Sequence, residues 1–289
     1  MSDATTMQSG SNATLWIHNL VDDLAGMTIK AKHAVFCGSS SFQKVEVYDT
    51  YAFGRIMVLA GSLMFTEADE FIYHEMISHP ALMKHGAPKS VCIIGGGDGG
   101  CLRQVLKYKS VREVTVVEID AMVRKTVEQY FPDLARSFSD KRVRMVIDDG
   151  YTFLEKSTDR FDVIIIDSYD PGGPVQSLET AGFFALVGDH CADNGVVVFQ
   201  TDSPLIKADF LRKTILGAGP YFKAWRPYIC AIPSFPAGIC SFLLCAQQAG
   251  ALDRETRPDD GVLATCRYVN AEVLTGAFLL PQNIRQTLA

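Results

Sequence analysis

A glycine-rich loop is the first feature of the sequence that could do chemistry. Gly95, Gly97 and Gly100 fit the spacing G-x-G-x-x-G between an apolar segment and a helical one, and Glu118 ends the next apolar segment, 18 residues after Gly100. Glycines allow a tight turn and a close approach of the backbone to a ligand, and the acid can bind ribose hydroxyls. The pattern predicts a nucleoside-binding α/β fold. Dinucleotide dehydrogenases and adenosyl-sulfonium transferases both use such a loop.

Asp98 lies in the middle of this loop and narrows the choice of ligand. A pyrophosphate favours the amides of a helix N-terminus without a neighbouring anion, so this carboxylate is badly placed for one. The same carboxylate would repel the carboxylate of intact S-adenosylmethionine. It suits a ligand that ends in a bare ammonium, and decarboxylated S-adenosylmethionine is such a ligand.

Further carboxylates follow two other expected strands. Asp149 comes after the third strand, and Asp167 and Asp170 come after the fourth. Because open α/β sheets bind ligands beyond the carboxyl ends of their strands, these acids should share one cleft with Asp98 and Glu118. The loops that carry them contain no Lys or Arg, so the sequence predicts a site for cations. A metal ion with oxygen ligands is the weaker alternative, and no metal site is expected, because no cluster of His or Cys accompanies the acids.

The elements that position these acids can be read from the hydrophobic pattern. Short apolar and alternating runs between about residues 28 and 71 indicate a small antiparallel β-domain. Thr66 is expected to be the N-cap of a helix over 67–82. From Ser90 onward apolar strands alternate with helices, which indicates a parallel sheet covered on both faces.

The expected parallel strands are Val91–Ile94, Val114–Ile119, Val143–Ile147, Phe161–Asp167 and Gly195–Gln200. An antiparallel pair is expected to follow at Ile229–Pro233 and Ile239–Cys245. The chain is expected to divide into a disordered tail (1–13), an N-terminal β-strand domain (14–75) and a Rossmann-like catalytic domain (76–289).

The composition limits the classes of partner. The 289 residues are 48% hydrophobic, enough for one sizeable core, and the net charge of −6 would repel a phosphate backbone, which argues against nucleic acid. No apolar run approaches the roughly 20 residues that span a bilayer, so no membrane association is expected. The eight cysteines form no Cys-x-x-Cys pair, and several lie in apolar runs. Buried reduced thiols and a cytoplasmic location are therefore expected.

Several segments of the chain resemble polyamine aminopropyltransferases of the spermidine synthase type. The segments are IIGGGDGG, VVEID, IDDG, IDSYDPGGP, TEADEFIYHEM, GRIMVL, AIPSFPAG and AFLLPQ, and they occur in order over roughly residues 30 to 285. The resemblance implies an N-terminal β-domain ahead of a Rossmann-like fold of the class I methyltransferase type, and a homodimer or homotetramer. It also implies transfer of an aminopropyl group from decarboxylated S-adenosylmethionine to a diamine, with release of methylthioadenosine and no other cofactor.

The resemblance assigns roles on the donor side of the site. Gln43 and Glu118 should hold the nucleoside, with Glu118 on the ribose hydroxyls. Asp149 should accept a hydrogen bond from the adenine amino group, and Gly150 lies beside it. Asp98 should hold the ammonium of the aminopropyl group.

The acceptor side is assigned in the same way. Asp167 resembles the acid that acts as general base, and Tyr73 resembles its hydrogen-bonding partner at the attacking amine. Asp170 should hold the diamine. His74 is expected on the substrate side, with a packed helical histidine as the alternative. The segment 168–177, rich in Gly and Pro, resembles a gate loop that a ligand orders.

Departures from the family pattern gather at the acceptor end. Ala60 and Met64 stand where relatives carry Asp and Gln, and Phe235 stands where they carry Tyr. Asp202 replaces a longer Glu and is expected to reach a diamine or a bridging water, while Tyr169 is bulkier than usual. Putrescine is the expected acceptor, and because of these departures cadaverine, a triamine or another amine remain as alternatives.

Three other functions remain open from the sequence. A polyamine N-methyltransferase would share the scaffold, but Asp98 disfavours intact S-adenosylmethionine. An NAD-dependent oxidoreductase would fit the glycine spacing and Glu118, but Asp98 and the pair Asp167 and Asp170 oppose it. A non-catalytic polyamine-binding paralogue would be favoured by loss of Asp167, which is present.

Overall fold

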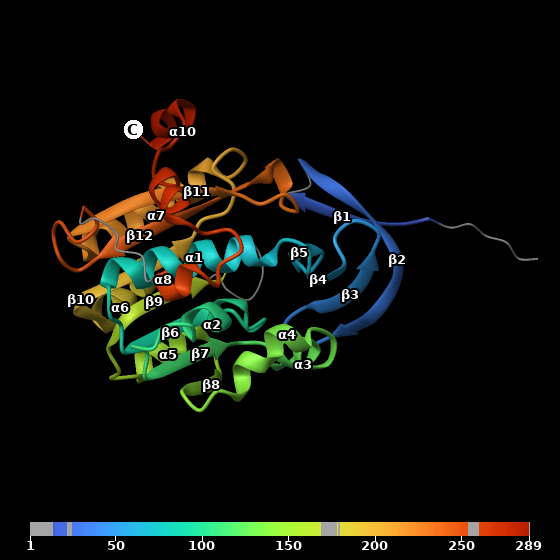
Figure 1. Cartoon of the computed structure of the whole chain (residues 1–289), viewed down its shortest axis with the longest axis horizontal. Helices are drawn as coiled ribbons and strands as arrows, with labels where there is room; N and C mark the ends of the chain where they lie inside the picture. Colours follow the sequence, from blue (N-terminus) through green and yellow to red (C-terminus); the bar gives the residue numbers. More distant parts are fainter. Residues whose placement is uncertain (1–13, 22–24, 169–177, 179, 254–259, 289) are drawn as a thin grey trace, which may run out of the picture.

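The computed structural model describes residues 14–21, 25–168, 178, 180–253 and 260–288. The expected tail (1–13) and most of the expected gate loop (169–177), with Tyr169 and Asp170, lie outside the described residues. Two β-sheets form the framework, and the N-terminal strands lie beside one end of the larger sheet (Figure 1).

The N-terminal sheet is antiparallel and meanders in chain order, as predicted. Its strands are β1 (Leu15–Val21), β2 (Ala25–Ser39), β3 (Lys44–Thr50), β4 (Arg55–Leu59) and β5 (Ser62–Thr66). Ala60 and Gly61 connect β4 to β5 with φ of 49° and 89°, the left-handed conformation that two-residue hairpin loops require. Val45, Val47 and Phe65 pack against two helices that follow in the chain, around Val127 and Leu134, so the two parts of the molecule share a core.

The larger sheet has seven strands in the order β11-β12-β10-β9-β6-β7-β8. Strands β10, β9, β6, β7 and β8 are parallel, and β12 pairs antiparallel with both β10 and β11. The strands are β6 (Ser90–Gly95), β7 (Glu113–Glu118), β8 (Val143–Ile147), β9 (Phe161–Asp167), β10 (Cys191–Gln200), β11 (Ala224–Ala231) and β12 (Ile239–Ala246). The predicted parallel sheet with a final antiparallel pair is confirmed.

Successive residues of the buried strands point to opposite faces of this sheet, so apolar side chains lie on both faces. Helices cover both of these faces. Val91 and Ile93 of β6 pack in one core with α1 and α2, while Cys92 and Ile94 pack in another with α5, α6 and α7. The helices are α1 (Glu70–His85), α2 (Gly100–Val105), α3 (Ala121–Tyr130), α4 (Pro132–Ala135), α5 (Gly150–Lys156), α6 (Ala181–His190), α7 (Ala208–Ala218), α8 (Asp260–Leu263), α9 (Ala271–Gly276) and α10 (Gln282–Leu288). None of the helices in the described ranges is long and apolar enough to cross a bilayer.

The prediction of Thr66 as the N-cap of α1 is wrong. Thr66 pairs with Ile56 as the last residue of β5, and the helix begins only at Glu70, with Asp69 in the cap position. The Thr66 hydroxyl donates to Asp69 Oδ1 at 2.7 Å and accepts from Asp69 N at 3.3 Å, so it bonds within the turn before the helix. Thr66 stays in the strand because its backbone pairs with Ile56 of β4, and residues 67–69 form a turn before the helix begins.

The prediction for the cysteines is confirmed in six cases and wrong in two. Cys92, Cys101, Cys191, Cys230, Cys240 and Cys245 are buried, and all eight cysteines are free thiols. Cys37 is exposed and Cys266 is half-buried. Cys37 is exposed because its side chain lies on the solvent side of β2.

Glu75 of α1 fixes the C-terminal part of the chain. Its carboxylate is 1% exposed and accepts three backbone N–H bonds, from Arg267 at 2.9 Å, Tyr268 at 2.9 Å and Val269 at 3.0 Å. A buried acceptor that serves several amides leaves all of them unsatisfied when it is removed. The segment 267–269 therefore depends on one side chain that lies nearly 200 residues earlier in the chain.

We expect Glu75→Ala to lower the free energy of unfolding by about 3 kcal/mol, because three amides lose their acceptor. Urea denaturation monitored by circular dichroism measures the change. Glu113→Ala is the matched control, since Glu113 is exposed and should change stability by less than about 0.5 kcal/mol. Equal losses in the two variants would contradict this role of Glu75.

Candidate functional site

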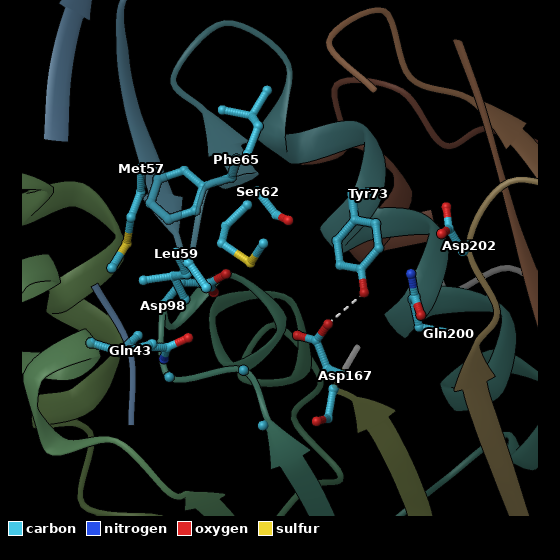
Figure 2. Close-up of a pocket in the computed structure, with 18 of the residues that line it drawn as sticks. Gln43, Met57, Leu59, Ser62, Phe65, Tyr73, Asp98, Asp167, Gln200 and Asp202 are labelled. Carbon is cyan, nitrogen blue, oxygen red and sulfur yellow. Dashed lines mark hydrogen bonds between the residues drawn. The ribbon is translucent and has the colours of Figure 1, made fainter. Parts of the chain in front are cut away.

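A cavity of about 660 Å³ lies where the carboxyl ends of β6, β7 and β9 meet the β4–β5 hairpin. Figure 2 shows Gln43 and Asp98 at one end of this cavity, Asp167 and Tyr73 near its middle, and Gln200 and Asp202 toward the other end. The acids Asp98, Glu118, Asp149 and Asp167 all line it, so their predicted convergence is observed in the structure. Lys207, which the sequence analysis did not identify, also lines the cavity.

The glycine loop can close onto two neighbouring strands only because Gly95 and Gly97 lack side chains. Gly95 has φ of 82°, and a Cβ there would lie 2.1 Å from the carbonyl oxygen of Asp167. A Cβ at Gly97 would lie 2.5 Å from Glu118 Oε2. The loop thus brings backbone amides and Asp98 against the ends of β7 and β9, as the motif predicts.

Glu118 is held by backbone amides on the floor of the cavity. Its carboxylate accepts from Gly97 N at 3.1 Å and from Asp120 N at 2.8 Å. Burial raises the pKa of Glu118 to about 7, although these two amides act in the opposite direction. Gln43 approaches from the β2–β3 turn and donates through Nε2 to Asp120 Oδ2 at 3.2 Å. The two carboxylate oxygens of Glu118 can accept hydrogen bonds from vicinal hydroxyls, as an acid at this position does in a ribose-binding site.

Asp149 and Gly150 form the adjoining wall at the start of α5. Asp149 is the N-cap of this helix and accepts from Thr152 N through Oδ1 at 2.8 Å. A Cβ at Gly150 would lie 2.5 Å from Ile94 Cγ2, so the helix can pack this close to β6 only with glycine here. Asp149 and Gly150 both line the cavity, and the carboxylate of Asp149 is an acceptor that suits a base with an amino group.

Asp98 is backed by a buried chain of charges. Its Oδ1 accepts from Gly100 N at 2.7 Å, and its Oδ2 lies 3.3 Å from His74 Nε2. His74 Nδ1 in turn lies 2.6 Å from Glu70 Oε2, and Arg103 Nη2 donates to both oxygens of Glu70 at 2.8 and 2.7 Å. The His74 ring is 1% exposed and lies behind Asp98, which favours the alternative of a packed helical histidine.

The pKa values of Asp98, His74 and Glu70 follow from the alternation of acidic and basic side chains. Burial lowers the pKa of His74, but Asp98 and Glu70 outweigh it and raise the pKa to about 10. Burial likewise raises the pKa of Glu70, but His74 and Arg103 outweigh it and lower the pKa to about 2. The pKa of Asp98 is lowered against its burial, chiefly by His74. An imidazolium between two carboxylates therefore keeps Asp98 ionised at the cavity wall.

Glu70 and Arg103 support His74 behind Asp98, and the sequence analysis missed both of them. Glu70 precedes His74 by four residues, so the two side chains share one face of α1, and this spacing could have identified the pair. No comparable signal exists for Arg103, which comes from α2 and reaches Glu70 across 33 residues of sequence.

Asp167 ends β9 and receives the Tyr73 hydroxyl. Tyr73 Oη donates to Asp167 Oδ1 at 2.5 Å, and Figure 2 shows this bond inside the cavity. Burial, and next the charge of Asp98, raise the pKa of Asp167, while His74 and the donors at its oxygens act against them. Burial also raises the pKa of Tyr73 well above its usual range, so the hydroxyl stays neutral and donates. The arrangement is a carboxylate poised to take a proton.

The far end of the cavity is lined by aromatic and acidic side chains. Phe235 lies with its ring centroid 5.9 Å from that of Tyr73, and Asp202 adopts a left-handed backbone conformation with φ of 57°. Gln200 Oε1 is buried without a hydrogen-bond partner among the described residues. Asp170, expected at this end, lies outside the described residues. Within the described ranges, no group of His, Cys, Asp and Glu is arranged to hold a metal ion.

Comparisons with known proteins identify the family of this chain. The family model described as spermine/spermidine synthase domain matches residues 70–255, and the spermidine synthase tetramerisation domain matches residues 15–67. A polyamine aminopropyltransferase of Thermoanaerobacter pseudethanolicus is 34% identical over 94% of this chain and 97% of its own, and one of Bacillus mycoides is 33% identical over 93% and 97%.

Solved structures of spermidine synthases are also similar to this chain. A spermidine synthase in complex with the transition-state analogue AdoDATO superposes with a TM-score of 0.89, at 30% identity over 95% of this chain and 94% of the other. The spermidine synthase of Thermotoga maritima gives a TM-score of 0.86 at 29% identity, over 95% and 94%. Fold and site define a Rossmann-like transferase with an N-terminal β-domain. The chain belongs to the spermine/spermidine synthase family, and it is an enzyme of the polyamine aminopropyltransferase kind.

We expect the contribution of His74 to stability to depend on pH. Its pKa is raised from about 6.5 to about 10 in the folded protein, so its stabilisation is complete below about pH 6.5 and is lost as the pH rises toward 10. The difference in unfolding free energy between wild type and His74→Gln should therefore shrink from pH 6 to pH 10. Urea denaturation at a series of pH values measures it.

The matched control for this experiment is His33→Gln. His33 pairs with Asp49 at 3.3 Å, but its side chain is 63% exposed, so solvent screens the pair. This variant should differ little from wild type at any pH. A stability difference for His74→Gln that stays constant across the range would show that folding does not raise the pKa of His74.

Proposed function

We propose that this protein transfers the aminopropyl group of decarboxylated S-adenosylmethionine to a diamine, with putrescine as the acceptor, and releases methylthioadenosine. The observation that carries the proposal is the Tyr73–Asp167 hydrogen bond in the same cavity as the charge-backed Asp98. A general base thus stands beside a site for an ammonium. The names of the relatives, which are polyamine aminopropyltransferases, support the same reaction.

The donor would occupy the half of the cavity around the glycine loop. Glu118 would accept hydrogen bonds from the ribose hydroxyls, with Gln43 beside it. Asp149 would accept from the adenine amino group, and Gly150 would lie beside the base. Asp98 would bind the terminal ammonium, and its ionised state, maintained by His74, suits that charge.

The chemistry then needs a deprotonated amine in line with the carbon–sulfur bond. A diamine nitrogen carries a proton at neutral pH and cannot attack. Asp167 would take that proton, and the freed lone pair would form a bond to the methylene carbon next to the sulfonium. The carbon–sulfur bond breaks, its electron pair goes to sulfur, and neutral methylthioadenosine leaves. Burial raises the pKa of Asp167 and so makes it a stronger base, while positioning supplies the remaining acceleration.

The acceptor end would recognise the length and the distal charge of the amine. Phe235 and Tyr73 offer apolar surface for the methylene chain. Asp202 offers a carboxylate beyond them, and Asp170 is proposed to contribute another. We further propose a homodimer or homotetramer, which the match to a tetramerisation domain supports, and a cytoplasmic location.

We expect Asp167→Asn to lower kcat by about 10²- to 10⁴-fold, the range that a positioned general base supplies, because an amide cannot take the proton of the amine. Binding of methylthioadenosine should remain close to wild type, since Asp167 is not placed in the nucleoside half. Release of methylthioadenosine measured by mass spectrometry gives the rate, and calorimetry gives the affinity. Asp133→Asn, at a side chain that is 81% exposed, is the control and should keep full activity. Unchanged turnover in the Asp167 variant would remove it as the base.

We expect an acceptor panel to give most product with putrescine. The assay supplies decarboxylated S-adenosylmethionine with putrescine, cadaverine or spermidine and identifies the aminopropylated product by mass. Product with another amine only would keep the reaction and change the acceptor. Methylation with intact S-adenosylmethionine, and no product from the decarboxylated form, would contradict the role of Asp98.

A further inference from the structure

The two carboxylate oxygens of the proposed base have different surroundings. Oδ1 accepts from Tyr73 within the cavity, whereas Oδ2 lies 2.9 Å from the Sγ atom of Cys101. A Cβ at Gly96 would lie 3.1 Å from Oδ2, so this second oxygen faces the glycine loop. Figure 2 shows one oxygen of Asp167 directed at Tyr73 and the other turned away from it.

Cys101 meets the requirements of a hydrogen-bond donor at this position. It is 0% exposed and lies in α2, in the core that also holds Leu102 and Val105. Burial, and next the negative charge of Asp167, raise the pKa of the Cys101 thiol well above its usual range. The sulfur therefore keeps its proton, and the S–H group can donate to Oδ2.

We infer that Cys101 is a positioning residue for the general base: its thiol holds Oδ2 toward the loop and leaves Oδ1, beside Tyr73, to take the proton of the acceptor amine. The inference rests on the proposed function, because it assumes that Asp167 is the base. Cys101 does not touch the substrate and acts only through Asp167. A thiol suits this place because it packs as a small apolar group in the core and still carries one weak donor.

A donor at Oδ2 also affects the pH at which the base is active. A hydrogen bond to the charged form of a carboxylate favours that form, so the thiol opposes the effect of burial on Asp167. Among the described residues, the titratable groups that act on Asp167 are Tyr73 and His74 of α1, Asp98 of the glycine loop, Cys101 of α2 and Cys240 of β12. Of these, Tyr73 and Cys101 donate hydrogen bonds to its oxygens.

The experiment compares Cys101→Val, Cys101→Ala and Cys101→Ser with wild type. Valine and alanine remove the donor, and serine restores one as a hydroxyl. The measured quantity is kcat/KM for putrescine from pH 6 to pH 10 at saturating decarboxylated S-adenosylmethionine, so that titration of the substrate is the same in every variant. The affinity for methylthioadenosine is measured beside it and reports whether the nucleoside half is intact.

Cys92→Val is the matched control. Cys92 is also fully buried, but it lies in β6 in the core on the opposite face of the sheet. This variant tests the cost of replacing a buried thiol without a change at Asp167. Its pH profile should coincide with that of wild type.

The profile of kcat/KM against pH has an acid limb, on which activity falls as Asp167 becomes protonated. In Cys101→Val and Cys101→Ala we expect this limb to shift toward higher pH by about half a unit to one unit, because Asp167 loses a donor that favours its charged form. On that limb kcat/KM should fall by about three- to tenfold, while the affinity for methylthioadenosine stays unchanged. Cys101→Ser should keep the limb at or below its wild-type position. Alanine and serine are smaller than cysteine, so this pair decides the question if valine disturbs folding.

Two outcomes would overturn the inference. One is an acid limb that does not move in Cys101→Ala, and the other is an equal shift in Cys101→Ala and Cys101→Ser, which would reflect volume and not the donor. Asp167→Asn in the same assay separates this inference from the proposed function. If Asp167→Asn is inactive and the acid limb of Cys101→Ala does not move, only the role of Cys101 is removed. If Asp167→Asn is active, the assignment of Asp167 as the base is removed, and this inference with it.

Discussion

Burial of several carboxylates around one cavity is the constraint on which the rest of the site depends. Removing a carboxylate from water disfavours its charged form, and each acid here receives different partners against that penalty. Asp98 receives an imidazolium and stays ionised. Glu118 receives only backbone amides, and its pKa rises to about 7. Asp167 accepts hydrogen bonds from a neutral hydroxyl and a neutral thiol. These donors do not outweigh its burial, so its pKa stays raised. Three acids on one sheet edge thus acquire separate properties from their neighbours.

The framework could be predicted from the sequence because its signals are local. Phe161–Asp167 and Val143–Ile147 are rich in β-branched and other apolar residues and are bounded by turn residues, and both coincide with observed strands. The convergence of Asp98, Glu118 and Asp167 also followed from a local fact, namely that each ends or follows a parallel strand. The short helices α8 to α10 were missed because segments of four to seven residues carry too little periodicity.

The supporting shell of the site could not be predicted in the same way. Cys101 contacts Asp167 across 66 residues of sequence, and Arg103 contacts Glu70 across 33. Whether such side chains meet depends on the angle at which α2 packs on α1, and no local pattern encodes that angle. Thr66 failed as a cap for a related reason, since the ladder with β4 overrides its capping preference.

Helix α1 connects the two halves of the site. Adjacent residues on a helix point about 100° apart, so Tyr73 and His74 reach different acids, Asp167 and Asp98. At the start of the same helix, Asp69 accepts from the backbone and the hydroxyl of Ser234, each at 2.9 Å, and so holds the segment that carries Phe235. Movement of this one helix would displace the ammonium site, the base and the apolar wall together. Its burial against the larger sheet therefore fixes the relative positions of the proposed donor and acceptor sites, which in-line transfer requires.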